Sequence, residues 1–249
     1  MLRIALACLL LLSLPASAMV GGAAPATGAT RASVMITGPH GFCTGTMIAR
    51  DLVLTAAHCV PSGADYKLVE FDDKRQPVLR DIARVATHPQ FSMPTFLAHR
   101  ATADVALVKL AVPLAIAPAV LMEGAPKVAP GDLFTIAGYG LSERGNGRSG
   151  GTLRSAALAA TGKPGNLQIR LVDPATNGAR MGLGACTGDS GGPVFQDGGG
   201  RPLVIGVISW STGPNNSDGC GGLTGVTPLS LYRGWIVETA RKLGSPITP

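Results

Sequence analysis

One stretch decides the fold of this chain: Gly184-Ala185-Cys186-Thr187-Gly188-Asp189-Ser190-Gly191-Gly192-Pro193. It holds a serine between glycines, with an acidic residue directly before the serine. Glycine has no Cβ, so the backbone around this serine can take left-handed angles and come close to a ligand. A nucleophilic serine needs a base, a carboxylate that orients the base, and donors for an oxyanion. These partners are therefore expected elsewhere in the sequence.

Two other stretches supply the expected residue types. Leu54-Thr55-Ala56-Ala57-His58-Cys59 places a histidine at the end of a strand, and Ala103-Asp104-Val105-Ala106-Leu107-Val108-Lys109-Leu110 places an aspartate before an apolar strand. Imidazole, with an ordinary pKa of about 6.5, can take the hydroxyl proton and pass it to a leaving amine. A carboxylate fixes the imidazole tautomer. The three stretches together resemble the trypsin/chymotrypsin family of serine endopeptidases, whose triad runs in the order His, Asp, Ser.

The resemblance covers essentially the whole chain after residue 18 and implies both fold and site. It implies an all-β fold of two six-stranded antiparallel Greek-key β-barrels with a C-terminal α-helix. Residues 19–125 would form the barrel carrying His58 and Asp104, residues 126–228 the barrel carrying Ser190, and residues 229–249 the helix and tail. Ser190 would be the nucleophile, His58 the general base and acid, and Asp104 the orienting group, with the N–H groups of Gly188 and Ser190 as the oxyanion hole.

The strand pattern read from the residues alone favours an antiparallel barrel or sandwich. Short apolar runs separated by Gly and Pro turns predict two series of strands, joined by a Pro-rich linker over 111–132 and followed by a helix over 229–243. The predicted strands are 32–37, 42–48, 52–55, 66–71, 78–86, 105–110, 133–138, 152–160, 167–172, 193–196, 203–210 and 225–228.

Composition argues against a disordered chain and against a nucleic-acid-binding protein. The chain has 249 residues, 46% of them apolar, with 34 Gly and 19 Pro, as expected for a globular protein rich in turns. Its net charge of +6 is spread along the sequence without a basic run, so nucleic acid is not an expected partner. The expected partner is a protein or peptide substrate, and the expected state is a monomer.

The N-terminus has the pattern of a secretory signal peptide. Arg3 precedes the apolar run Ile4–Leu14, and Ala16-Ser17-Ala18 is a small-x-small cleavage site. The run is much shorter than the roughly 20 residues that span a bilayer. We therefore expect residues 1–18 to be removed, and the mature protein to be secreted to a periplasm or the cell exterior without a membrane anchor.

The cysteine count is consistent with a secreted protein. Of five cysteines, Cys8 lies in the predicted signal, which leaves four with three possible pairings. No cysteine or histidine spacing is typical of a zinc site, and no metal or cofactor is expected. The resemblance implies the disulfides Cys43–Cys59 and Cys186–Cys220.

The new N-terminus itself carries a motif of the family. Met19-Val20-Gly21-Gly22 is similar to the Ile-Val-Gly-Gly terminus that inserts beside the acidic residue preceding the serine. The resemblance implies an ion pair between the Met19 α-ammonium and Asp189. Because Met19 directly follows the predicted cleavage site, we hypothesise that signal cleavage alone creates the activating terminus.

Specificity is expected from a pocket with an uncharged base. Alignment outward from Ser190 puts the base at Gly184, with Ala185 beside it, while Ser209-Trp210-Ser211 resembles the segment that lines one wall and pairs with substrate. No aspartate stands at the base to bind Lys or Arg. Cleavage after small to medium apolar residues is therefore expected.

Two alternative classes remain open at this stage. A secreted binding protein could keep the fold without useful turnover. An α/β-hydrolase esterase would match Gly188-Asp189-Ser190-Gly191-Gly192, but that fold expects the serine before the aspartate and histidine. Glu70, Asp72 and Asp73 fall near a position where some family members bind calcium, although a solvated strand end is the simpler interpretation.

Overall fold

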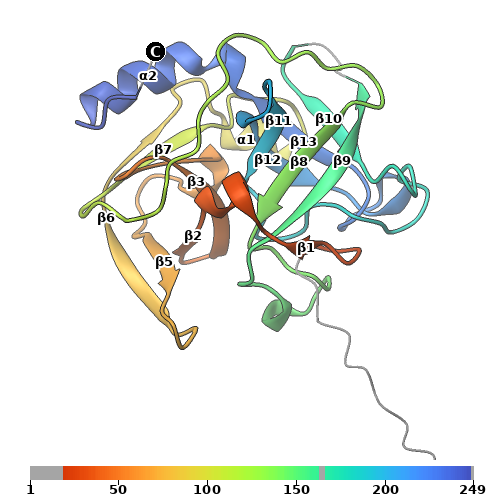
Figure 1. Ribbon diagram of the computed structural model, residues 1–249, viewed down its shortest axis with the longest axis horizontal. Coiled ribbons are helices and arrows are strands. Elements are labelled where there is room, and N and C mark those ends of the chain that lie inside the picture. Colours follow the sequence, from red (N-terminus) through yellow and green to blue (C-terminus); the bar gives the residue numbers. More distant parts are fainter. Residues whose placement is uncertain (1–18, 163–165, 248–249) are drawn as a thin grey trace, which may run out of the picture.

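The computed structural model describes residues 19–162 and 166–247, and its strands form two closed barrels side by side (Figure 1). The expected all-β, two-barrel fold is confirmed. The predicted signal peptide, residues 1–18, lies outside the described residues.

The first barrel contains six antiparallel strands in the order β2-β3-β4-β7-β6-β5, closed by pairing of β5 with β2. Closure leaves no unpaired sheet edge, and side chains that alternate inward along each strand fill the interior. Val34, Ile36, Leu68 and Val108 are among the buried residues of this core. The strands are β2 (Ser33–Gly38), β3 (Gly41–Ala49), β4 (Leu52–Thr55), β5 (Lys67–Phe71), β6 (Pro77–Thr87) and β7 (Ala106–Leu110).

The second barrel repeats this arrangement in the order β8-β9-β10-β13-β12-β11, closed by pairing of β8 with β9 as well as with β11. Phe134, Ile136, Leu158 and Val226 lie in its core, where full burial of each such side chain stabilises the fold by roughly 1.5–3 kcal/mol. The strands are β8 (Leu133–Gly138), β9 (Arg154–Gly162), β10 (Ile169–Val172), β11 (Pro193–Asp197), β12 (Pro202–Ser211) and β13 (Thr224–Pro228).

The N-terminal segment packs on the second barrel, although it lies in the range that sequence analysis assigned to the first. The short strand β1 (Ala24–Pro25) pairs with β9. Met19 is fully buried in the core of the second barrel, and Val20 forms an antiparallel bridge with Gly184. Residues 19 and 20 are thus held against the second barrel and the start of the serine stretch.

The expected C-terminal helix is present as two pieces, the 3-10 turn η5 (Leu229–Leu231) and α2 (Arg233–Lys242). Ile236 and Ala240 bury one face of α2 in a cluster that also contains Leu54 of the first barrel and Val207 of the second. The helix therefore covers apolar side chains from both barrels.

The segment 111–132 is ordered against both barrels. Leu114 N–H donates to the Arg50 carbonyl at 2.7 Å, and Met122 N–H donates to the Val204 carbonyl at 2.9 Å. These bonds carry the chain from the first barrel across to β12 of the second. The sequence predicted this segment as a linker because its prolines interrupt any strand pattern.

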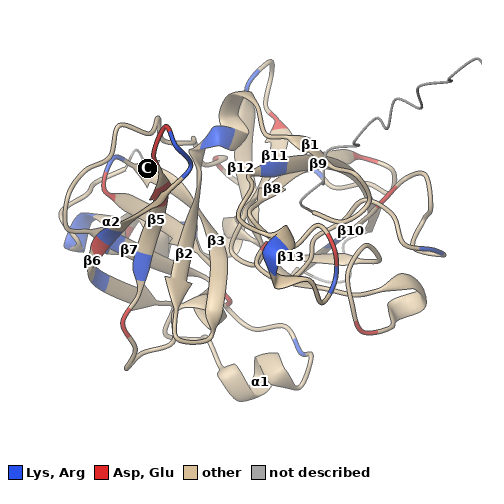
Figure 2. Cartoon of the chain, turned by 90° about the horizontal axis from the view of Figure 1, so that it is seen from below, with Lys and Arg blue, Asp and Glu red and all other residues tan. Residues whose placement is uncertain are grey.

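Charged residues of both signs occur on each barrel of the described chain (Figure 2). Figure 2 shows basic and acidic residues scattered over both barrels, as the dispersed charge pattern predicts. Among the described residues, no helix has both the length and the apolar character needed to cross a bilayer. The remaining short elements are η1 (Gly28–Ala32), η2 (Ala57–Cys59), α1 (Met93–Leu97), η3 (Gly147–Ser149) and η4 (Pro214–Asn216).

Candidate active site

Strand pairing in the first barrel brings His58 and Asp104 together. Thr55, the last residue of β4, pairs with Ala106, the first residue of β7, so the segments beyond these two ends are neighbours. His58 lies in η2 just after β4, and Asp104 lies just before β7. The two ends of adjacent antiparallel strands thus converge on one point at the edge of the barrel.

The Asp104 carboxylate holds both the backbone and the ring of His58. It accepts the His58 backbone N–H at 2.9 Å on Oδ1, and its Oδ2 lies 2.8 Å from His58 Nδ1. Asp104 is 1% exposed, so these bonds compensate for the loss of water around the carboxylate. An ionised carboxylate only accepts hydrogen bonds, so Nδ1 carries the proton in the neutral ring and Nε2 is left as the basic atom.

Ser209 provides a third donor to the same carboxylate. Its hydroxyl donates to Asp104 Oδ2 at 2.5 Å, and the residue is 5% exposed. Ser209 belongs to β12, so this bond joins the two barrels at the histidine–aspartate pair. Sequence analysis assigned Ser209 only to the wall of the substrate pocket. Its hydroxyl was missed as a ligand of Asp104 because nothing in the local pattern of β12 indicates which distant group it meets.

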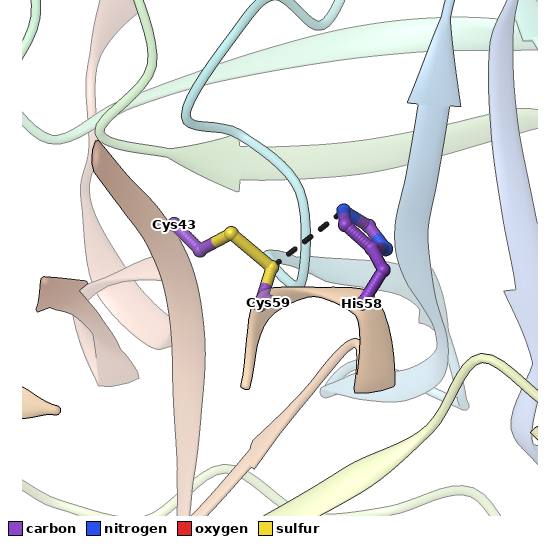
Figure 3. A group of neighbouring side chains, drawn as sticks. All are labelled: Cys43, His58 and Cys59. Carbon is purple, nitrogen blue, oxygen red and sulfur yellow. Dashed lines mark hydrogen bonds between the residues drawn. A yellow bond between two sulfur atoms is a disulfide. The ribbon is translucent and has the colours of Figure 1, made fainter. Parts of the chain in front are cut away.

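The Ser190 backbone lies beside the His58 ring. Thr44 N–H donates to the Ser190 carbonyl at 2.9 Å, and the Cys59 sulfur lies 3.6 Å from the same oxygen. That sulfur is also 3.7 Å from His58 Nε2 (Figure 3). The Cys59 sulfur therefore contacts both the serine turn, through the Ser190 carbonyl oxygen, and the imidazole of His58. No hydrogen bond joins the Ser190 hydroxyl directly to the imidazole of His58 in the described part of the chain.

Glycine is required where the serine turn meets the first barrel. Gly191 has a φ of +80°, and a Cβ there would lie 2.1 Å from Thr55 Oγ1 and 2.3 Å from the Thr44 carbonyl oxygen. No side chain fits this gap. The glycine after the serine thus allows the second barrel to approach the strand that leads to His58.

The backbone next to Ser190 offers two donors. Gly188 has a φ of +94°, and the Phe42 ring closes the space where its Cβ would stand. Its carbonyl is turned away and accepts the Thr44 hydroxyl at 2.8 Å. Within residues 19–162 and 166–247, neither the Gly188 N–H nor the Ser190 N–H donates to a protein acceptor. Both are available to a developing oxyanion.

Asp189 is a fully buried carboxyl with no cationic partner in the part of the chain that the structure describes. It accepts the N–H groups of Gly140 on Oδ1 and of Cys186 on Oδ2, each at 2.8 Å. Burial raises its pKa to about 7, and these two hydrogen bonds only partly offset that rise. No ion pair to Asp189 occurs among the described residues. The expected partner, the amine of Met19, is a peptide nitrogen in the full-length chain.

Both expected disulfides are formed, Cys43–Cys59 and Cys186–Cys220. They flank the site, since Cys59 follows His58 and Cys186 begins the serine turn. Cys43, His58 and Cys59 also place two sulfurs and a ring nitrogen within 4.8 Å of one another (Figure 3). Metal binding by cysteine requires the thiolate, so the disulfide removes two of these three ligands.

A stacked aromatic ring on His58 was not predicted. Phe96 of α1 lies with its ring centroid 4.3 Å from that of His58, and the two planes are 13° apart. Ser92 caps α1 through the Thr95 N–H, and Pro94 stands in its first turn. This cap and proline pattern was the available signal for a helix start, but the helix is only five residues long and has no apolar period.

The backbone lies close to a neighbouring loop at Gly184, the predicted base of the specificity pocket. A Cβ on Gly184 would be 3.0 Å from the Gly221 Cα, so the two backbones nearly touch. Ala185 N–H donates to the Thr224 hydroxyl at 3.1 Å. The Ser211 hydroxyl donates to the Gly219 carbonyl at 3.2 Å. These contacts place no charged side chain at the predicted base.

Trp210, the central residue of the predicted wall, lies across the neighbouring strand. Its indole covers Gly225 of β13, where a Cβ would be 2.0 Å from the ring. Trp210 and Gly225 are paired in the register of β12 and β13. The absence of a side chain at Gly225 therefore lets the indole lie flat on the sheet.

The acidic group Glu70, Asp72 and Asp73 is engaged mostly in local contacts. Glu70 accepts from Arg80 at 2.5 Å, and Asp72 Oδ1 accepts the N–H groups of Lys74 and Gln76. Asp72 therefore caps the turn between β5 and β6. These contacts are those of a solvated strand end.

Comparison with known proteins agrees with this geometry. Residues 19–236 match the sequence model of the Trypsin family. The chain is 30% identical over 229 residues to a vitellin-degrading protease of Bombyx mori, covering 85% of this chain and 80% of that protein. It is 29% identical over 217 residues to a trypsin of Phaedon cochleariae, covering 80% and 79%, and 29% identical over 244 residues to serine protease 56 of Mus musculus, covering 88% and 38%. The chain belongs to the trypsin family of serine proteases.

Proposed function

We propose that this protein is a secreted serine endopeptidase that hydrolyses peptide bonds through an acyl-enzyme, with Ser190, His58 and Asp104 as its triad. The observation that carries the proposal is the His58–Asp104 pair, which is joined by two hydrogen bonds and lies beside the Ser190 turn. A buried carboxylate with three donors holds the imidazole with Nε2 as the basic atom, as a general base for a hydroxyl requires.

The proposed reaction begins with attack of Ser190 Oγ on the carbonyl carbon of the substrate. The hydroxyl proton moves to His58 Nε2, and the carbonyl oxygen becomes an oxyanion bound by the N–H groups of Gly188 and Ser190. Loss of one such donor typically raises the barrier by about 3 kcal/mol. Asp104 stabilises the imidazolium that forms, because its charge is already in place and needs no reorganisation.

The tetrahedral intermediate then collapses, and the leaving amine takes the proton from His58 Nε2. This step leaves an ester between Ser190 and the acyl half of the substrate. Water, deprotonated by His58 Nε2, attacks the ester, and the same proton returns to Ser190 Oγ as the acid product leaves. The chemistry balances without a metal or cofactor.

The proposed preference is for a small to medium apolar residue before the scissile bond. Its support is the base of the pocket, where Gly184 faces Gly221 and no charge is available to a Lys or Arg side chain. Apolar pockets distinguish such residues by only about 1–3 kcal/mol per methylene. Graded selectivity is therefore expected.

The proposed activating step is release of the Met19 amine by signal cleavage. The supporting observations are the buried Asp189 carboxyl without a cation and the packing of Val20 against Cys186, whose N–H binds that carboxyl. A charged α-amine beside Asp189 would convert a costly buried group into an ion pair. This proposal also requires that residues 1–18 direct secretion.

A peptide-library cleavage profile tests the proposed function. Mature wild-type protein should cleave peptides after Ala, Val or similar residues, and Ser190→Ala protein purified in parallel should cleave none of them. A profile dominated by Lys or Arg would refute the pocket assignment. Equal cleavage by Ser190→Ala would refute the triad.

A further inference from the structure

A groove of about 540 Å³ lies next to the proposed triad, and its lining includes two arginines that the proposed reaction does not involve. We call it the cationic groove. It lies between the α1 loop and the outer end of β12, and its lining includes Phe96, Arg100, Arg170, Trp210, Thr212 and Asp218. Phe96 stacks on His58, and Ser209, which also lines the groove, donates to Asp104. The groove therefore begins where the proposed reaction takes place.

Strand register sets Arg170 beside the floor of the groove. Arg170 on β10 pairs with Gly225 on β13, and Gly225 pairs with Trp210 on β12. Antiparallel partners point to the same face of the sheet, so Arg170 and Trp210 flank the bare Cα of Gly225. Neighbouring Ile169 and Leu171 are fully buried, which directs Arg170 outward.

The opposite wall is the loop after α1. Arg100 follows His99, which has a φ of +55°. The Arg100 backbone N–H donates to the Thr95 carbonyl at 3.1 Å. The far end of the loop is tied down by Thr102, whose hydroxyl accepts the Ser92 N–H at 3.0 Å. Figure 2 shows α1 projecting at the junction of the two barrels. Arg100 is thus presented by an anchored loop.

Neither guanidinium has an ion-pair partner among the residues that the structure describes. The lining carries a single carboxylate, Asp218, which is exposed and lies in none of these ion pairs. Arginine presents a planar set of donors that matches a carboxylate, and nearby aromatic surface reduces competition from water. The balance of charge in the groove favours an anionic occupant.

We propose that Arg100 and Arg170 select substrates with an Asp or Glu two to four residues before the scissile bond. This proposal rests on the proposed function, because a substrate strand along Ser209–Ser211 is what would carry such a side chain into the groove. An extended peptide advances about 3.3 Å per residue with alternate side chains on opposite faces. One of these positions would therefore face Trp210 between the two arginines.

Matched peptides test the proposal. Each pair has Glu or its isostere Gln at one of the three positions, with Ala before the scissile bond. One position should give a kcat/KM about five- to tenfold higher for Glu, since each exposed ion pair is worth about two- to fivefold. High salt should reduce this ratio. Equal or lower rates for Glu at all three positions would overturn the proposal.

Substitutions assign the effect. Arg100→Gln and Arg170→Gln should each lower the Glu/Gln ratio by about two- to threefold, and the double variant should bring it to about one. Arg201→Gln is the matched control, because this exposed arginine lies outside the groove, just before β12, and should leave the ratio unchanged. A ratio that survives the double variant would contradict the assignment.

A binding measurement separates this proposal from the proposed function. Ser190→Ala protein is titrated calorimetrically with the same Glu and Gln peptides, so no turnover is needed. Tighter binding of the Glu peptide, lost in the Arg100→Gln/Arg170→Gln background, supports the groove even if the wild type cleaves nothing. Equal binding of the two peptides would overturn the groove proposal while leaving the protease assignment intact.

Discussion

The charge state of Asp189 should make the stability of the precursor and of the mature protein respond differently to pH. The perturbation is one glycine added before Met19. In this blocked form the Met19 nitrogen is part of a peptide bond and is no longer a free amine. In the blocked form Asp189 is a buried carboxyl whose pKa burial raises from 3.8 to about 7. Each pH unit of that rise corresponds to about 1.4 kcal/mol, so ionising the group costs the folded state about 4 kcal/mol.

The sign follows from proton binding. Between pH 4 and pH 7 the folded blocked protein keeps a proton on Asp189 that the unfolded chain has lost. The contribution of Asp189 to the free energy of unfolding should therefore be greatest near pH 4 and fall by about 3 kcal/mol as the pH rises to 7. In protein that begins at Met19, the α-ammonium pairs with the carboxylate, so this loss should be largely absent.

Urea unfolding from pH 4 to pH 8 measures both proteins, with Ser190→Ala in each to prevent self-digestion. Other titrating groups are common to both proteins and cancel in the difference. Asp189→Asn is the control and should abolish the difference between the blocked and mature forms. Superimposable pH profiles for the blocked and mature proteins, or a difference that persists in Asp189→Asn, would refute the reasoning.

Three further substitutions probe the site and its scaffold. Asp104→Asn should lower kcat by about 10⁴-fold because the amide favours the wrong imidazole tautomer, and a loss below tenfold would contradict the assigned role. Ser209→Ala removes the 2.5 Å donor to Asp104 and should lower kcat by about tenfold with KM little changed; an effect on KM alone would restrict Ser209 to substrate binding. Gly191→Ala puts a methyl group 2.1 Å from Thr55 Oγ1 and should reduce the free energy of unfolding by about 3 kcal/mol, and thermal unfolding unchanged from the wild type would refute this fit.

Most of the fold was predictable because the signals are local. Short apolar runs place β4 and β8 at the predicted residues, and the other ten predicted strands differ by a few residues at their ends, whereas the two-residue strand β1 was not predicted. The helix predicted over 229–243 is present as α2, in which Ile236 and Ala240 are buried. Its first turn is instead the separate 3-10 element η5, in which Leu231 is half exposed.

The contacts that complete the site were not predictable, because they join residues far apart in the chain. The Ser209–Asp104 bond spans 105 residues and two barrels. The stack of Phe96 on His58 depends on a short helix whose position is set by its cap and its loop anchor. The cationic groove arises from the register of β10, β13 and β12, and one residue of slip in that register would turn Arg170 into the core.

The central claim is that His58 activates Ser190, and covalent labelling tests it most directly. Mature protein is incubated with a fluorophosphonate near pH 7.5, and the adduct is located by peptide mass spectrometry. The account predicts a single adduct on Ser190, none in Ser190→Ala, and labelling slowed at least about a thousandfold in His58→Ala. An unlabelled wild type, an adduct on another residue, or labelling of His58→Ala at the wild-type rate would contradict it.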